Sequence, residues 1–276
     1  MLSLIRHPGD FPTEFLEAYQ AKRLVFFCGA GVSNYPWVPD YYGSFEALCV
    51  YLLNYFCPSW QLVEGEFKRL FDQCNYELLL DRLDLEYGSS QLRAFIKQSL
   101  THTVMNRPHH ETLLKLAHNT SQSIITTNFD PLFENPTSHP LHLTPVYLPE
   151  RLESYNLQKF LTGKLVYLHG GVSSTENELV YTETHFTNAY IKVINDAWAT
   201  QFLLQCMQRY HLCFVGYSVN DPLVSRLMPV FKANEPFAMV TQNASESMQR
   251  KGITPLSFEK YDIMWNVLTT WSELPV

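Results

Sequence analysis

LVFFCGAGVS, at residues 24–33, is the stretch that decides the fold expected for this chain. It begins with a continuous apolar run of strand length, which two glycines and a serine end abruptly. Glycine lets the backbone turn sharply and bring N–H groups close to an anion, and a helix starting after the turn would add its positive end. The stretch therefore predicts a buried strand followed by a phosphate-binding turn. Alone the signal is weak, because Asn34 stands where a dinucleotide fingerprint has its third small residue and such turns also serve plain packing.

Three further segments repeat this pattern of an apolar run that ends in small or polar residues. They are IITTNFD at 124–130, LVYLHGG at 165–171 and LCFVGYSVNDP at 212–222. Continuous hydrophobicity is typical of parallel strands that helices cover on both faces, and ligands of such sheets bind beyond the carboxyl ends of the strands. We therefore expect an α/β fold, a Rossmann-like parallel sheet flanked by helices, with the four polar clusters at one edge. Phe237–Thr241 and Ile253–Leu256 are predicted as further strands.

About seventy residues after the first turn have helical spacing instead. Helices are predicted there at 44–56, 62–71, 76–85 and 92–100, and another at 108–117 that leads back to the sheet. We interpret residues 41–107, approximately, as a helical insertion lobe within a single domain that spans 1–276. Later amphipathic helices are predicted at 196–210 and 221–231, and the four prolines within 135–149 predict an irregular connection near the site.

Composition narrows the class of protein. The 276 residues are 46% hydrophobic, which is ample for one large core. The net charge is −7 and Lys and Arg form no run, which argues against direct nucleic-acid binding because phosphate affinity comes from clustered cations. Apolar stretches are too short to span a bilayer and the N-terminus lacks a signal-peptide core, so we expect a cytoplasmic protein without a membrane partner.

The cysteines and histidines do not predict a metal site. The six cysteines contain no Cys-x-x-Cys pair, and those in apolar runs, such as Cys28 and Cys213, are typical of small core residues rather than of a disulfide framework. His109 and His110 are adjacent in sequence and cannot readily share a metal ion, so we interpret them as structural.

Taken together, the motifs resemble the sirtuin superfamily, and within it the zinc-free sirtuin-like domains of prokaryotic anti-phage defence proteins. The matching pieces lie in the order of that family between about residues 20 and 271: Gly29-Ala-Gly-Val-Ser33, Thr127-Asn-Phe-Asp130, Leu168-His-Gly170, Gly216-Tyr-Ser218 with Asn220-Asp-Pro222, and Gly252-Ile-Thr-Pro-Leu256. Each piece is common alone, whereas the ordered set is specific. The histone-deacylating branch carries two Cys-x-x-Cys pairs around a structural zinc, which this chain lacks, so no zinc ribbon is expected. The residues that follow the first turn in that branch are also replaced here by Asn34–Asp40, to which we assign no role.

The resemblance implies NAD as the substrate, and two side chains suit cleavage of its nicotinamide–ribose bond. Nicotinamide leaves as a neutral ring, so the reaction needs a stabilised oxocarbenium-like ribose and a placed nucleophile rather than an acid. The amide of Asn128 offers donors and an acceptor to ribose hydroxyls and an attacking water, and His169 is suited to taking a proton at neutral pH. We predict both as catalytic, although each motif alone is more typical of a turn, a helix cap or a strand end.

The remaining candidate site residues are predicted to bind NAD. They are Gly29, Ala30, Gly31, Ser33, Asp130, Gly216 and Ser218. The turn at 29–33 would hold the pyrophosphate through its backbone amides and its serine, and Asp130 would orient Asn128 or the loop. Gly216 and Ser218 would accept the adenosine half. The resemblance implies these same roles.

Three functions stay open at this stage. The first is an NAD hydrolase that releases nicotinamide and ADP-ribose and depletes NAD in defence; the second is an NAD-dependent protein deacylase; the third is a module that binds NAD or ADP-ribose without turnover. The absent zinc pairs and the replaced 34–40 loop favour hydrolysis over deacylation, and the presence of both Asn128 and His169 disfavours mere binding. If the 276 residues are the whole protein, nothing in them resembles a separate sensor domain. The resemblance then suggests restraint by homo-oligomerisation or by a partner such as a ring-forming ATPase, and the sequence does not indicate the trigger or a preference between NAD and NADP.

Overall fold

The computed structural model describes residues 4–62, 65–101, 106–134, 143–148, 161–174, 179–191, 197–218 and 235–274. Within these ranges seven parallel strands form one sheet in the order β3-β4-β2-β1-β5-β6-β7. The strands are β1 Leu24–Cys28, β2 Ile124–Thr126, β3 Thr144–Tyr147, β4 Lys164–Tyr167, β5 His211–Val215, β6 Phe237–Thr241 and β7 Thr254–Phe258. The predicted α/β fold with a Rossmann-like parallel sheet is confirmed.

The central strand, β1, explains why its sequence is continuously apolar. All five of its residues are buried. Val25 and Phe27 point into one hydrophobic core, while Leu24, Phe26 and Cys28 point into the core on the opposite face. A strand that is covered on both faces has no solvent side, so it shows no polar alternation.

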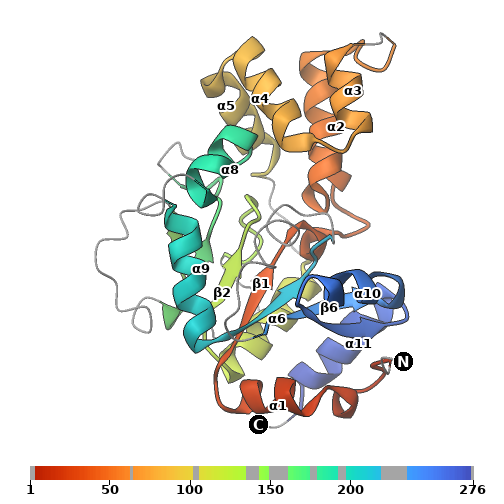
Figure 1. Cartoon of the computed structure of the whole chain (residues 1–276), viewed down its shortest axis with the longest axis vertical. Helices are drawn as coiled ribbons and strands as arrows, with labels where there is room; N and C mark the ends of the chain where they lie inside the picture. Colours follow the sequence, from red (N-terminus) through yellow and green to blue (C-terminus); the bar gives the residue numbers. More distant parts are fainter. Residues whose placement is uncertain are drawn as a thin grey trace.

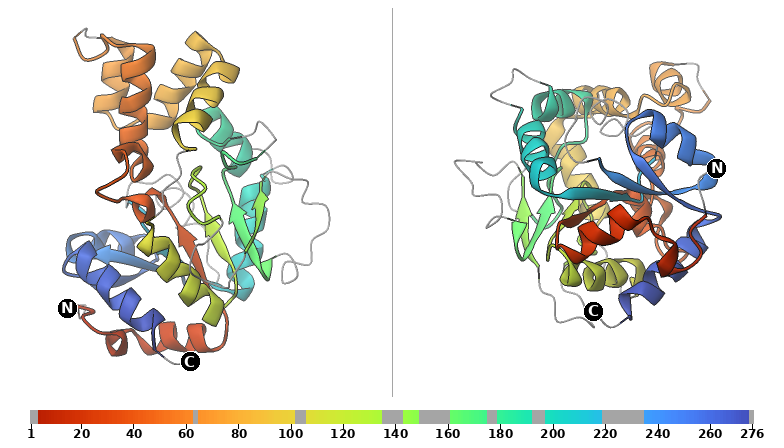
Figure 2. Two further views of the ribbon diagram at one scale, coloured as in Figure 1. Left: turned by 180° about the vertical axis from the view of Figure 1, so that it is seen from behind. Right: turned by 60° about the horizontal axis from the view of Figure 1, so that its bottom comes forward.

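Helices cover the two faces of the sheet (Figure 2). α1 Thr13–Gln20, α6 Pro108–Asn119 and α11 Tyr261–Ser272 contribute buried residues to the core on one face. α8 Glu183–Tyr190, α9 Trp198–Arg209 and α10 Gln242–Arg250 contribute to the core on the other. α9 corresponds to the amphipathic helix predicted at 196–210, and its apolar face packs on the sheet.

A lobe of four helices lies beyond the end of β1 (Figure 1). It consists of α2 Phe45–Phe56, α3 Glu66–Asp72, α4 Tyr76–Tyr87 and α5 Ser89–Ser99, and α2 begins at its cap Ser44, whose side chain accepts a hydrogen bond from the backbone of Ala47. The lobe has its own hydrophobic core, which also contains Phe129 and Val172 from the segments that follow β2 and β4. The lobe is therefore packed over the carboxyl ends of the strands, where ligands of such sheets bind.

The order of the strands marks a switch point between β1 and β5. After β1, the next three strands in the chain, β2, β3 and β4, lie on one side of it. The chain then crosses to the other side of β1, where it forms β5, β6 and β7. In open parallel sheets the crevice that accepts a ligand lies where the strand order reverses in this way. The turns that follow β1 and β5 border this crevice.

Some local predictions were wrong. Residues 144–147 form the edge strand β3 rather than an irregular connection, and Pro145 is tolerated because β3 pairs only with β4 in the described sheet. The turn after β1 is followed by a single 3-10 turn, Ala30–Ser33, and not by an α-helix that could direct its positive end at a phosphate. Helix α8 was not predicted, and the helix predicted at 221–231 lies outside the described residues.

The cysteines are all described, and all six are free thiols. Within the described ranges there is no group of three or more His, Cys, Asp or Glu side chains that could hold a metal ion. Among the helices that the structure describes, none combines the length and the apolar character needed to cross a bilayer.

Candidate functional site

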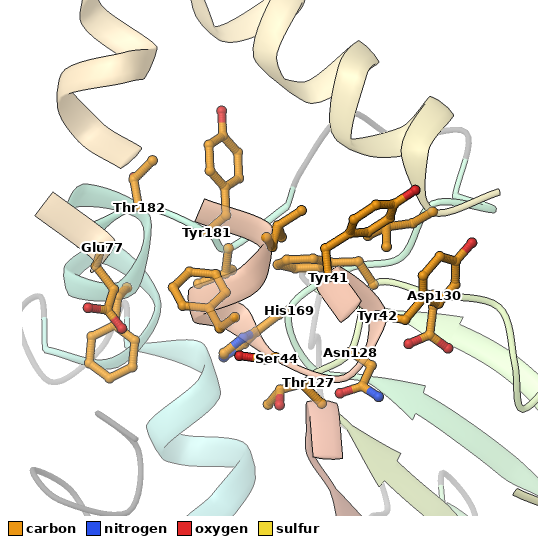
Figure 3. A pocket seen from close by; sticks show the side chains of 17 residues that line it. Tyr41, Tyr42, Ser44, Glu77, Thr127, Asn128, Asp130, His169, Tyr181 and Thr182 are labelled. Carbon is orange, nitrogen blue, oxygen red and sulfur yellow. The ribbon is translucent and has the colours of Figure 1, made fainter. Parts of the chain in front are cut away.

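A pocket of about 750 Å³, counting the space at its open mouth, lies between the lobe and the sheet (Figure 3). Ala30 follows β1, residues 127–130 follow β2 and His169 follows β4, so three of the four predicted polar clusters line it. The lobe side contributes mainly aromatic and apolar side chains, among them Tyr41, Tyr42 and Phe45. An apolar cavity with a few convergent polar groups is typical of a small-molecule site.

Asn128 presents an unpaired oxygen atom at this pocket. Its side chain is only 7% exposed, and its Nδ2 donates a hydrogen bond of 3.1 Å to Ser33 Oγ. Its backbone N–H is held by Thr126 Oγ1 at 3.1 Å. Asn128 Oδ1 is buried and has no hydrogen-bond partner among the described residues. Because a buried acceptor without a partner is costly, this oxygen is the group in the pocket that is best placed to accept a hydrogen bond from a ligand.

Asn128 is supported by Asp130, which also lines the pocket, and by Ser33, which lies outside the lining. Ser33 is fully buried, and its hydroxyl donates to Asp130 Oδ2 at 2.9 Å. Asp130 Oδ1 accepts the backbone N–H of Leu132 at 3.1 Å. Burial raises the pKa of Asp130 to about 6, while the hydrogen bonds from Leu132, Ser33 and Asn128 favour its charged form. The Ser33 side chain thus contacts the Asn128 amide, and its predicted contact with pyrophosphate stays a prediction.

His169 lines the pocket and is partly exposed. Its Nε2 lies 2.7 Å from the hydroxyl of Tyr190 on α8. Gly170 follows with φ +76°, a backbone conformation that favours glycine and turns the chain sharply after the histidine. Burial lowers the pKa of His169 to about 3, so the imidazole is neutral at pH 7, which is the state that can accept a proton.

The predicted glycines lie at the switch point but outside the lining of this pocket. The Gly31 N–H donates to Gly216 O at 3.0 Å, which joins the turns after β1 and β5. A Cβ atom on Gly29 would lie 2.8 Å from Gly216 O, and one on Gly216 would lie 2.5 Å from Val32 N. The glycines are therefore required for close packing of the two turns, and their predicted contacts with NAD stay predictions.

The fourth predicted polar cluster, which follows β5, lies only partly within the residues that the structure describes. Thr127 Oγ1 lies 2.6 Å from the hydroxyl of Tyr217, so the segments after β2 and β5 are in contact. Ser218 is exposed at the end of its described range, and the Asn220-Asp-Pro222 piece of the motif lies outside the described residues.

Sequence reasoning missed the residues that complete the pocket from the lobe and from α8. They include Tyr41, Tyr42, Ser44, Glu77, Tyr181, Thr182 and Phe186 in the lining, and Tyr190 behind His169. Their only local signal is the cap at Ser44, because which side chains face the sheet depends on how the lobe packs. The histidine pair was interpreted as structural, and in the structure His110 Nε2 lies 3.4 Å from Ser33 Oγ beneath the pocket.

Comparison with known proteins places the chain in a family. A model of the SIR2-like domain matches residues 122–263, just over half of the chain, and the chain belongs to this family. Proteins with SIR2-like domains are generally NAD-dependent enzymes, which agrees with the resemblance found in the motifs. The match includes Asn128, Asp130, His169 and the turn at Gly216.

The chain is also similar to a longer bacterial protein. It is 26% identical over 296 aligned positions to "Uncharacterized protein y4cA" of Sinorhizobium fredii (strain NBRC 101917 / NGR234). The alignment covers 96% of this chain but 24% of that protein, so the chain spans about a quarter of the length of its relative.

Proposed function

We propose that the protein hydrolyses NAD at the nicotinamide–ribose bond and releases nicotinamide and ADP-ribose. The observation that carries this proposal is the buried, unpartnered Asn128 Oδ1 among the described residues of a pocket that also contains His169. An oxygen acceptor and a neutral imidazole in the same pocket are the two groups that an attacking water needs, one to orient it and one to take its proton. Membership in the SIR2-like family supports NAD as the substrate.

The reaction balances without a metal ion or a redox partner. The bond between the ribose C1′ and the pyridinium nitrogen breaks, and its electron pair neutralises the ring. Water adds to C1′ and gives its proton to the neutral imidazole of His169, which then releases it to solvent. Asn128 Oδ1 would accept a hydrogen bond from the water or from a ribose hydroxyl as positive charge develops at C1′.

A biological role in prokaryotic defence, by depletion of NAD, is part of the proposal and rests on the resemblance in the motifs. An enzyme that drains NAD has to be restrained, so we propose that the chain acts in a homo-oligomer or with a partner protein such as a ring-forming ATPase.

The direct test incubates the purified protein with NAD alone, and separately with NAD and an acetyl-lysine peptide. We expect nicotinamide and ADP-ribose in equal amounts without the peptide. If acetyl-ADP-ribose forms with peptide and ADP-ribose is absent without it, the protein is a deacylase. If calorimetry detects NAD binding but neither mixture yields nicotinamide, with the assembled and the dissociated protein both assayed, the protein is a binding module.

A further inference from the structure

We infer that His110, held by Tyr35, is a positioning residue that keeps the Ser33 hydroxyl directed at Asp130, so that Ser33 and Asp130 together hold the Asn128 amide with its oxygen and not its nitrogen facing the substrate. The orientation itself is a property of the fold, whereas its kinetic consequence rests on the proposed function.

A row of buried polar contacts lies beneath the pocket. His110 is fully buried on α6, and its Nδ1 lies 2.6 Å from the hydroxyl of Tyr35. Its Nε2 lies 3.4 Å from Ser33 Oγ. Ser33 in turn contacts Asp130 at 2.9 Å and the Asn128 amide at 3.1 Å. Five side chains thus form a continuous series of polar contacts that starts at Tyr35 and reaches Asn128 in the pocket.

We assign the protons in this row from the donors and acceptors that face one another. Burial lowers the pKa of His110 well below its usual range, so the ring is neutral and carries one proton. The Tyr35 oxygen lies 3.4 Å from the His110 backbone N–H, which can only donate, so the tyrosine proton is free to point at Nδ1. The His110 proton is then on Nε2 and faces Ser33. Ser33 accepts it and gives its own proton to the Asp130 carboxylate, which accepts only.

This arrangement determines which end of the Asn128 amide faces inward. Ser33 Oγ has a single proton, and Asp130 receives it. Both lone pairs of the Ser33 oxygen are then available only to donors, and His110 Nε2–H and Asn128 Nδ2–H are the donors that face it. A flipped amide would place Oδ1 against the Ser33 oxygen and lose the hydrogen bond. Asn128 Oδ1 is therefore held toward the pocket as an acceptor.

Tyr35 is held in place independently of its hydroxyl. Its ring stacks on Trp37 at 5.2 Å and on His109 at 4.6 Å, and His109 stacks on Trp265 of α11 at 3.9 Å. Removing only the hydroxyl, as in Tyr35→Phe, therefore leaves the packing of the loop in place. This substitution isolates the hydrogen bond to His110.

The first test reads the His110 tautomer and does not depend on activity. In protein labelled with ¹⁵N-histidine, two-bond ¹⁵N–¹H correlations distinguish the two neutral tautomers from the charged ring, and His110→Gln identifies the His110 signals. We expect a neutral ring with its proton on Nε2 in the parent protein, from pH 5.5 to 8. A proton on Nδ1, or a charged ring, would overturn the inference whether or not NAD is cleaved.

The second test separates turnover from binding. Tyr35→Phe and His110→Leu should lower kcat for NAD by about 10- to 100-fold and leave KM within about twofold, because a misplaced amide acts on the barrier. His110→Gln should recover most of the loss seen in His110→Leu, since its amide nitrogen can replace Nε2–H as a donor to Ser33. Tyr19→Phe, which removes a buried hydroxyl on α1, is the matched control and should match the parent.

The outcomes distinguish this inference from the proposed function. If the parent cleaves NAD while folded Tyr35→Phe keeps the parent kcat, or if His110→Gln is no better than His110→Leu, the positioning role is wrong. Thermal melts identify any variant that fails to fold, and Tyr35→Phe carries the test if His110→Leu does not fold. If the parent does not cleave NAD, the proposed function fails and the tautomer result alone decides the inference.

Discussion

Asn128 and His169 come from neighbouring strands, β2 and β4, and both line the pocket. Each is held by a side chain that local sequence does not reveal, Ser33 for Asn128 and Tyr190 for His169. The motifs identified which residues meet at the edge of the sheet. They did not identify what orients them, because those contacts join residues far apart in the chain.

Loss of the imidazole should affect turnover rather than binding. We expect His169→Ala to lower kcat by about 10²- to 10⁴-fold, the range typical of a general base. Calorimetry should show NAD affinity close to that of the parent. Tyr190→Phe should have a smaller effect, because it keeps the base and removes only its hydrogen-bond partner. A folded His169→Ala variant with the parent rate would exclude this residue as the base.

The pH dependence of kcat should report Asp130 and not His169. Asp130 has a pKa raised to about 6, so above that pH it is ionised and accepts the Ser33 proton. Below it, a protonated Asp130 can donate to Ser33 and disturb the Asn128 support, so kcat should fall as the pH falls through about 6. His169, with a pKa of about 3, stays neutral over this range. Of the other titratable groups near Asp130, Cys28 and Tyr167 have raised pKa values and His110 a lowered one, so all three stay uncharged.

The variant Asp130→Asn tests whether Asp130 causes the fall in kcat below about pH 6. Asp130→Asn should lower kcat and remove the pH dependence near 6. If kcat of Asp130→Asn still falls below about pH 6 as it does in the parent, another group causes the decrease.

At the scale of elements, the turns after β1 and β5 carry the tightest constraint. Gly216 and Gly252 both have φ +73°, but only Gly216 has backbone atoms close to where a Cβ would lie. Among the described residues, nothing lies within 4 Å of a Cβ built on Gly252. The two glycines therefore separate the cost of a left-handed backbone from the cost of a steric clash.

Both substitutions to alanine should destabilise the fold, but unequally. Gly252→Ala should cost about 1 kcal/mol for the positive φ alone. Gly216→Ala should cost more, by about 1–3 kcal/mol, because its Cβ would lie 2.5 Å from Val32 N. Urea unfolding of the two variants and the parent measures the difference. Equal losses would mean that the turns after β1 and β5 move apart without penalty.

The elements that the sequence predicted best have strong local signals. β1, β2, β4 and β5 are apolar runs, and the helices of the lobe and α9 have clear amphipathic spacing. β3 was missed because four residues that include Pro145 show no alternation, and only pairing with β4 makes them a strand. The walls of the pocket were missed for a related reason, since they depend on how the lobe packs over the strand ends.

At the scale of the whole molecule, three histidines are kept neutral by the fold. Burial lowers the pKa of His109 to about 4, that of His169 to about 3, and that of His110 well below its usual range. Two of them lie on α6, against α11 and the turn after β1, and the third lies at the end of β4. Protonation of any of them would therefore disturb contacts between elements rather than an exposed surface.

Stability should consequently fall on acidification. In the unfolded chain these histidines protonate near pH ~6.5, whereas in the folded protein they do not, so unfolding takes up protons between about pH 6.5 and 4. Asp130 acts in the opposite direction below about pH 6, but it is one group against three. We expect Tm to decrease steadily from pH 7 to pH 4.5, and His109→Phe, which keeps an aromatic ring in the stack, to reduce the slope. A Tm that is constant or rises over this range would contradict the lowered pKa values of the three histidines.

The most direct measurement follows nicotinamide release from NAD alone, by the parent protein and by Asn128→Ala, with NAD affinity measured calorimetrically for both. We expect the parent to release nicotinamide and ADP-ribose in equal amounts. Asn128→Ala should bind NAD within severalfold of the parent and release nicotinamide at least about 100-fold more slowly, because the lost oxygen acts on the barrier. Equal rates for two folded proteins, or release from the parent only when an acyl peptide is added, would contradict NAD hydrolysis at this site.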